Sequence, residues 1–173
     1  MKRIGVLSDT HGWIHPDLFE FFENVDEIWH AGDIGGIDIY DQLAAFKPIK
    51  AVYGNTDDSK VRLVCPKTQS FTVENVKILM THIGGHSGKY EYGVRDLFVA
   101  EKPKIFVCGH SHIAKVMYDK KYDFLYINPG AAGYRGFHKY MTAIRFVIDG
   151  DNIKDLELIE LGEREKLFIE KMK

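Results

Sequence analysis

The sequence lacks the features that mark secreted, membrane-spanning and nucleic-acid-binding proteins. Its 173 residues include only two cysteines, Cys65 and Cys108, which form no CxxC pair, so a disulfide framework or a zinc finger is disfavoured. The first apolar run is interrupted at Asp9, too early for a signal peptide, and no run is long enough to cross a bilayer. A net charge of −2 supplies no basic field for nucleic acid. We therefore expect a cytoplasmic protein with reduced thiols and no membrane partner.

The chain also has no internal repeat, low-complexity segment or linker. Its length falls within the usual range for one domain, so we expect a single domain over residues 1–173. It contains no GxGxxG or GxxxxGKS motif, which argues against a nucleotide-sensing module built on a phosphate-binding loop. The composition, 45% hydrophobic and 28% charged, is that of an ordinary globular protein.

The first part of the chain alternates apolar runs with amphipathic segments. Apolar runs predict strands at 4–7, 27–31 and 49–53. Helical spacing of apolar residues predicts helices over 16–23 and 37–46, the first beginning at a proline. This strand–helix rhythm is typical of a parallel sheet with helices on its faces.

The pattern changes after residue 70 and predicts a second sheet. Residues 71–74 and 76–80 read as a hairpin, 92–100 as a helix, and 105–108 as a buried strand. Antiparallel strands are expected at 113–118, 124–127, 141–148 and 153–161. The charged tail, 162–173, is expected to form a short helix. The fold class is therefore α/β with two sheets.

Five of the predicted strands are followed at once by residues that bind metals. These donors are Asp9, His11, Asp33, Asn55, His82, His110 and His112. Ligands of α/β sheets bind beyond the carboxyl ends of the strands, so we expect these side chains to converge. Taken alone, Asp9 could cap the next helix and His11 could be a loop residue. Four imidazoles, two carboxylates and an amide are too many for one tetrahedral zinc and suit two metals that share a ligand.

The motifs that carry these donors resemble, in order, those of the calcineurin-like metallophosphoesterase superfamily. They are Asp9-Thr10-His11, Gly32-Asp33, Gly54-Asn55, Thr81-His82 and Gly109-His110-Ser111-His112. The short spacing and the loop Asn128-Pro129-Gly130 resemble the compact YfcE-like phosphodiesterase branch. The resemblance implies a four-layer α-β-β-α sandwich, in which two mixed β-sheets are flanked by helices.

The resemblance also implies a metal assignment. It gives one metal to Asp9, His11, Asp33 and His112 and the other to Asp33, Asn55, His82 and His110, with Asp33 bridging. Mixed nitrogen and oxygen ligands favour Mn, Fe, Zn, Ni or Co over Ca or Mg, and manganese is our first expectation for both divalent ions. The implied activity is hydrolysis of a phosphodiester by a hydroxide that bridges the metals.

In this interpretation Asp33, Asn55 and His82 are catalytic, and Asn55 and His86 contact the substrate. That substrate would be a small phosphodiester such as a nucleotide, and related proteins suggest a homodimer or homotetramer. The alternative is a protein-binding scaffold like the retromer subunit, which resembles the same fold but has an altered metal site. Here no ligand position is missing, which favours the enzyme.

Several residues near the motifs are assigned by their context. Thr56 stands where larger members of the superfamily carry a histidine that protonates the leaving group, and a threonine hydroxyl is a poor acid. His30 is expected to support a ligand rather than to bind metal. Asp57 is expected to brace its loop. His15 and His138 are expected at the surface.

Overall fold

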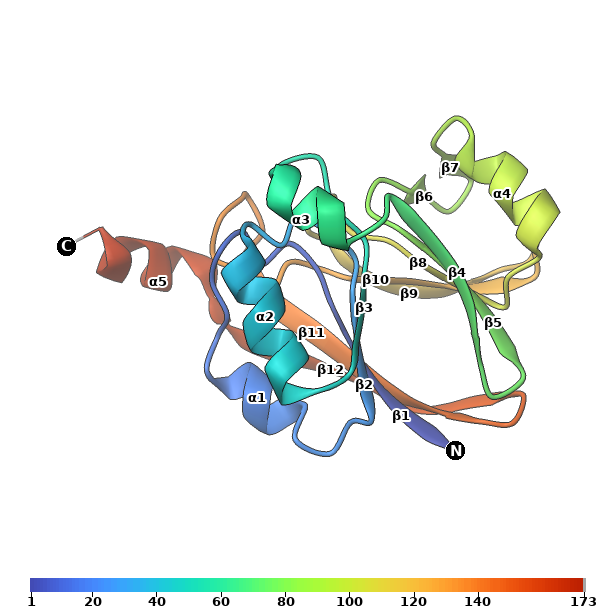
Figure 1. Cartoon of the computed structure of the whole chain (residues 1–173), viewed down its shortest axis with the longest axis horizontal. Coiled ribbons are helices and arrows are strands. Elements are labelled where there is room, and N and C mark those ends of the chain that lie inside the picture. The colour runs from blue at the N-terminus through green and yellow to red at the C-terminus, as the bar shows by residue number, and fades with distance from the viewer. Residues whose placement is uncertain (173) are drawn as a thin grey trace.

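The computed structural model describes residues 1–172, and Figure 1 shows its helices and strands. The first part contains β1 (Lys2–Leu7), α1 (Asp17–Phe21), β2 (Glu27–His30), α2 (Ile37–Phe46), β3 (Ile49–Ala51) and α3 (Ser59–Val64). The middle contains β4 (Thr68–Val73), β5 (Val76–Thr81), β6 (Gly85–His86), β7 (Lys89–Tyr90), α4 (Val94–Glu101) and β8 (Ile105–Val107). The last part contains β9 (Ala114–Asp119), β10 (Phe124–Pro129), β11 (Tyr140–Asp149), β12 (Asn152–Glu163) and α5 (Arg164–Lys171). No helix in this described part has the length and apolar character needed to cross a bilayer.

The first sheet has the strand order β12-β11-β1-β2-β3. Strands β1, β2 and β3 are parallel, as the strand–helix rhythm predicted. Strand β11 is antiparallel to β1, with Ile4 opposite Phe146, and β12 is antiparallel to β11. The sheet is therefore mixed, and the carboxyl ends of its three parallel strands lie along one edge.

The second sheet has the order β4-β5-β8-β10-β9. The predicted hairpin forms β4 and β5, and β8 lies parallel to both β5 and β10. Strand β9 pairs with β10 in antiparallel fashion. The carboxyl ends of β5 and β8 consequently lie side by side, as those of β1, β2 and β3 do in the first sheet.

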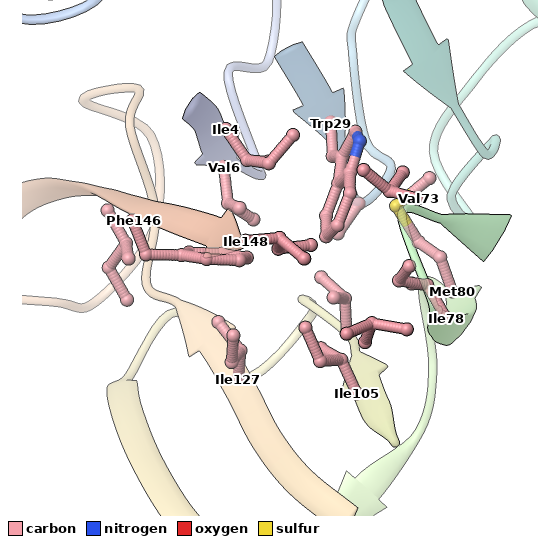
Figure 2. Close-up of a cluster of buried hydrophobic side chains, with 14 of the residues drawn as sticks. Ile4, Val6, Trp29, Val73, Ile78, Met80, Ile105, Ile127, Phe146 and Ile148 are labelled. Carbon is pink, nitrogen blue, oxygen red and sulfur yellow. The ribbon is translucent and has the colours of Figure 1, made fainter. Parts of the chain in front are cut away.

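A hydrophobic core fills the space between the two sheets. Side chains alternate along a strand, so Ile4 and Val6 of β1 point to one face while Leu7 points to the other. Figure 2 shows Ile4, Val6 and Trp29 from the first sheet facing Ile105 and Ile127 from the second. All five are 0% exposed, so this contact fixes the two sheets against each other.

Helices cover the outer faces of both sheets. A second cluster packs Leu18 of α1, Leu43 of α2 and Val61 of α3 against the first sheet. A third cluster packs Phe98 of α4 against Phe106 of β8 and its neighbours in the second sheet. These layers confirm the predicted sandwich of two mixed sheets flanked by helices (Figure 1).

Besides shifts of up to three residues at the ends of several elements, the structure differs from the sequence-based prediction in the following features. Helix α3 was not predicted; Asp58 caps it, because its carboxylate accepts a hydrogen bond from the Val61 N–H at 3.0 Å. The glycine-rich segment after His82 was predicted as a loop but contains the short pair β6–β7. Helix α1 is shorter than 16–23 because the chain turns at Phe22.

Candidate metal centre

The carboxyl ends of five strands bring the predicted donors together where the two sheets meet. Strands β1, β2 and β3 deliver Asp9 with His11, Asp33 and Asn55, and strands β5 and β8 deliver His82 and the pair His110 and His112. Two groups have ligand atoms within 4.8 Å of one another: Asp9, His11 and His112, and Asp33, His82 and His110. The donors therefore divide into two clusters, each with a carboxylate and two imidazoles.

The ligand atoms of the first cluster lie close enough together to bind one ion. Asp9 Oδ1 lies 3.1 Å from His112 Nε2 and 3.8 Å from His11 Nε2. The two Nε2 atoms of His11 and His112 are 3.3 Å apart.

Both carboxylates connect the two clusters, because Asp9 Oδ1 also lies 3.9 Å from His82 Nε2. Asp33 Oδ2 lies 3.3 Å from His82 Nε2 and 3.9 Å from His11 Nε2, so one carboxylate oxygen faces an imidazole of each cluster. Asn55 Oδ1 is 3.1 Å from His82 Nε2 and completes this side.

Five of the seven donor residues have backbone angles that ordinary residues avoid. The φ values are 54° for Asp9, 48° for His11, 52° for Asp33, 67° for His110 and 58° for His112. Left-handed conformations are uncommon for residues other than glycine and cost free energy. Such strain gathers at functional sites, where the surrounding structure enforces it. The fold therefore holds these five residues in unfavourable backbone conformations, which position their side chains in the site.

Two glycines allow the sheets to approach closely at this edge. A Cβ on Gly32, which has φ +95°, would lie 2.6 Å from Nδ1 of His82. A Cβ on Gly109 would lie 2.0 Å from Ser8 Oγ and 2.8 Å from Asp9 Oδ2. Glycine is therefore required before Asp33 and before His110, because any side chain there would collide with residues of the site.

The site is strongly negative at its centre. Burial by itself raises the pKa of Asp33, but His82 and the Thr56 N–H outweigh it and hold that pKa well below its usual range. Burial likewise opposes ionisation of Asp9, and His112 and His82 outweigh it, so the Asp9 pKa is also lowered. Two buried, ionised carboxylates in one site favour the binding of a cation there.

Hydrogen bonds behind the donors fix their orientation. The His82 Nδ1 atom lies 2.8 Å from the Ala31 carbonyl oxygen, which makes Nδ1 the donor and leaves Nε2 free to face Asp33. His30 is fully buried, and burial lowers its pKa to about 4. Its Nδ1 accepts from the Gly32 N–H, and its Nε2 contacts the Thr10 hydroxyl, as expected for a supporting residue.

The loop after β3 is braced by Asp57, as predicted. Its two carboxylate oxygens accept hydrogen bonds from the Gly35 N–H at 2.7 Å and the Gly54 N–H at 2.8 Å. Arg62 of α3 adds a second support that the sequence analysis missed. Its Nε donates to the Asp57 carbonyl at 2.7 Å and its guanidinium to the Asn55 carbonyl at 3.1 Å. The signal for it was Asp58, a good helix-capping residue four positions earlier.

The donor set fits a pair of divalent metal ions. Asp9 Oδ1 is buried and accepts no hydrogen bond from any described residue, although it faces the imidazoles of His11 and His112. An unpartnered buried carboxylate oxygen is costly and needs an explanation. A cation held by oxygen and imidazole nitrogen ligands supplies one, and two such clusters suit two ions.

Three histidines do not lie where the sequence predicted. His86 lies on β6, is exposed, and contacts the Ser87 carbonyl rather than the donor clusters. His15 and His138, both predicted at the surface, are half-buried, and Nδ1 of His138 lies 3.2 Å from Nδ1 of His112. The sequence carries no periodicity near residue 138 that would have indicated this contact, because a long loop between β10 and β11 delivers it.

Two cavities open from the donor clusters and meet at Asn55. The larger, about 630 Å³, extends past His82 between α3 and the start of α4, where Arg62, Lys67 and Tyr92 line it. The smaller, about 460 Å³, lies over His11, which follows β1, and over His110 and His112, which follow β8; Arg135 and Phe137 also line it. Both volumes are in the range of small-molecule sites.

Comparisons with known proteins agree with this geometry. Residues 1–151 match the profile of the calcineurin-like phosphoesterase superfamily domain. A probable metallophosphoesterase of Methanothermobacter thermautotrophicus is 28% identical over 165 residues, which cover 92% of each chain. Among solved structures, an archaeal phosphodiesterase has a TM-score of 0.71 at 21% identity and covers 91% of this chain and 99% of that one. Vps29 of Chaetomium thermophilum has a TM-score of 0.72 at 16% identity and covers 94% and 97%.

Proposed function

The chain belongs to the calcineurin-like phosphoesterase superfamily, and from this premise we propose that it is a dinuclear metal-dependent phosphodiesterase. Asp9, His11, Asp33 and His112 would hold one ion, and Asp33, Asn55, His82 and His110 the other. The support is the pair of donor clusters joined by Asp33, each with one carboxylate and two imidazoles.

The observation that carries the choice of a diester is the pair of cavities that meet at Asn55. A phosphodiester has two organic groups that leave the phosphorus in different directions, and the two cavities give each of them a place. A phosphate monoester has one such group and would leave the second cavity without a ligand. A diester also carries one negative charge fewer, which lowers repulsion toward the ionised carboxylates.

In this reaction the protein's own residues would bind the ions and orient the substrate phosphate. When bound, two divalent ions lower the pKa of a coordinated water and draw charge from the phosphate oxygens. Asp33 faces both clusters and sets their separation, whereas Asn55 lies at the entrance to both cavities, where its side chain can contact the substrate phosphate. His82 is held by the Ala31 carbonyl, so its Nε2 stays directed at the reacting centre.

A scaffold without catalysis is the competing function. The fold does not separate the two, because the archaeal phosphodiesterase and the Vps29 structure have TM-scores of 0.71 and 0.72. The donor set favours an enzyme: every predicted ligand position is filled, and the Asp9 oxygen left without a hydrogen bond has no use in a purely structural role.

The finer features of the proposal rest on general chemistry. Manganese is the first candidate ion because the ligands mix carboxylate oxygen and imidazole nitrogen. A cytoplasmic setting is supported by Cys65 and Cys108, which are both buried and free. The substrate would be a small diester, such as a nucleotide whose phosphate is esterified twice, since the cavities suit small molecules. Assembly as a homodimer or homotetramer is part of the same proposal.

The test compares a diester with its matched monoester. Metal-loaded protein would be assayed with bis(p-nitrophenyl) phosphate and with p-nitrophenyl phosphate, which share one leaving group. We expect kcat/KM to be at least about ten times higher for the diester, equivalent to about 1.4 kcal/mol of transition-state stabilisation. The Asp33→Asn variant controls for a contaminating phosphatase. Equal or better hydrolysis of the monoester would overturn the diester assignment, and no hydrolysis of either would favour the scaffold.

A further inference from the structure

His138 forms a hydrogen-bonded chain with His112, one of the candidate metal ligands. Its Nε2 lies 2.9 Å from the Gly133 carbonyl oxygen, and its Nδ1 lies 3.2 Å from Nδ1 of His112. The two rings meet edge to face, with centroids 5.2 Å apart and an angle of 72° between their planes. His138 is not part of any motif on which the family resemblance rests.

The contacts determine which ring nitrogens carry protons. A carbonyl oxygen only accepts, so Nε2 of His138 must be the donor to Gly133. In a neutral imidazole the other nitrogen is then an acceptor, and Nδ1 of His138 accepts from Nδ1 of His112. His112 therefore carries a proton on Nδ1, and its Nε2, 3.1 Å from Asp9 Oδ1, is the nitrogen left to bind an ion.

The other tautomer of His112 would defeat metal binding. Its proton would lie on Nε2, between the ring and Asp9, where the ion must bind. It would also direct two unprotonated nitrogens at each other across 3.2 Å in a half-buried place. His138 removes this alternative because its own tautomer is fixed by the Gly133 carbonyl.

The surrounding chain holds His138 in place. Arg164 Nε donates a hydrogen bond to the backbone carbonyl of His138 at 3.0 Å, which fixes this part of the loop. Gly136, at φ +131°, has no Cβ; one built there would lie 2.2 Å from His112 Nδ1 and 3.1 Å from His138 Nδ1. The loop is thus shaped for the contact between the two rings.

We infer that His138 is a positioning residue that selects the metal-binding tautomer of His112. This inference rests on the proposed metal site, but its first test needs neither metal nor activity. In metal-free protein, ¹⁵N–¹H correlation spectra of the histidine side chains report which nitrogen is protonated. We expect His112 to carry a proton on Nδ1, and His138 to carry one on Nε2 alone. His112 without a proton on Nδ1, or an equal mixture of its two neutral tautomers, would overturn the inference while leaving the proposed function intact.

Variants extend the test to metal affinity. His138→Leu removes the acceptor, and we expect one of the two metal sites to weaken by about 10- to 100-fold while the other is unchanged, as for lost supporting partners elsewhere. His138→Asn places a side-chain oxygen where Nδ1 stood and should restore most of the affinity. His15→Leu is the matched control, because His15 contacts the Asp17 N–H outside the site. Unchanged affinity of both sites in His138→Leu would contradict the inference, as would failure of the Asn variant to exceed Leu.

Discussion

Asp33 has the position from which one carboxylate faces both donor clusters. Its Oδ1 is held by the Thr56 N–H at 2.9 Å, and its Oδ2 lies between His82 and His11. Asn55 Oδ1 lies 3.1 Å from His82 Nε2, in the second cluster. The two residues are adjacent in the site but are not equivalent, and substitution should separate them.

The first prediction compares Asp33→Ala with Asn55→Ala. Loss of Asp33 removes a ligand from both proposed ions, so we expect the lower metal content and the larger loss of diester hydrolysis in Asp33→Ala. Asn55→Ala should keep the ion at Asp9, His11 and His112. Metal analysis and initial rates on the same preparations measure this. Equal losses of activity, with full metal content in both variants, would contradict the bridging assignment.

The second prediction concerns the leaving group. Thr56 is exposed at the rim of the smaller cavity and has no group that donates a proton usefully at neutral pH. A positioned acid contributes about 10²- to 10⁴-fold to such a step. We therefore expect log kcat/KM to fall steeply as the pKa of the leaving alcohol rises in a series of aryl esters. Thr56→His should flatten the slope, and a flat slope in the unaltered protein would show that another acid acts, His86→Ala being the variant to test next.

At the scale of elements, helix α3 supports the loop that carries Asn55. Arg62 lies over the Tyr53 ring at 4.7 Å and donates to the carbonyls of Asp57 and Asn55. The planar guanidinium can serve both carbonyls and the ring at once, which a lysine ammonium cannot. The helix is therefore part of the site, although it contributes no ligand.

The third prediction follows from that support. Arg62→Lys keeps the charge but loses the fork of hydrogen bonds, so we expect about tenfold weaker binding at the metal site that contains Asn55, within the usual range for lost supporting partners. Calorimetric titration with Mn²⁺ measures the two sites. Arg95→Lys, an exposed substitution on α4, is the matched control and should change neither site. An unaltered affinity in Arg62→Lys would show that the Asn55 loop does not depend on α3.

The sequence predicted most elements because their periodicity is strong. The apolar runs of β1, β2, β5 and β8 are buried over most of their length, as expected for strands that are covered on both faces. The donors were found because each follows such a strand. Helix α3 has six residues and a short apolar stripe, so periodicity could not reveal it. The contact of His138 with His112 joins residues 26 apart through a loop, and no local pattern encodes it.

At the scale of the whole molecule, the buried carboxylate of Asp119, on β9 of the second sheet, binds the β6–β7 segment to that sheet. Asp119 is 4% exposed and accepts hydrogen bonds from the hydroxyls of Tyr90 and Ser87 and from the N–H groups of Lys121 and Tyr122. Burial by itself raises the pKa of Asp119, but these bonds, that of Tyr90 foremost, outweigh it and lower the pKa below 3.8.

The fourth prediction is the pH dependence of that contribution. Because the folded pKa is depressed, the charged group stabilises the fold above the unfolded pKa, and the stability is lost as the pH falls through the folded value. Asp119→Asn should lower the free energy of unfolding by about 2 kcal/mol at pH 7, as for hydrogen bonds to charged groups. The difference from the unaltered protein should shrink below about pH 4. Urea denaturation at pH 7 and pH 3 measures it.

The matched control is Asp123→Asn, which changes an exposed aspartate on the same hairpin, paired with Lys104 at the surface. We expect a much smaller effect than for Asp119→Asn, because exposed ion pairs contribute little to stability. A difference for Asp119→Asn that stays constant from pH 7 to pH 3 would show that the carboxylate charge does not stabilise the fold.

The central claim is that catalysis of diester hydrolysis requires two metal ions at the junction of the sheets. The most direct measurement titrates metal-free protein with Mn²⁺ while the initial rate on bis(p-nitrophenyl) phosphate and the bound metal are followed together. The account predicts binding of two ions per chain and a rate that rises only as the second ion binds, because each donor cluster holds one ion. A full rate at one ion per chain, or two bound ions with no hydrolysis, would contradict it.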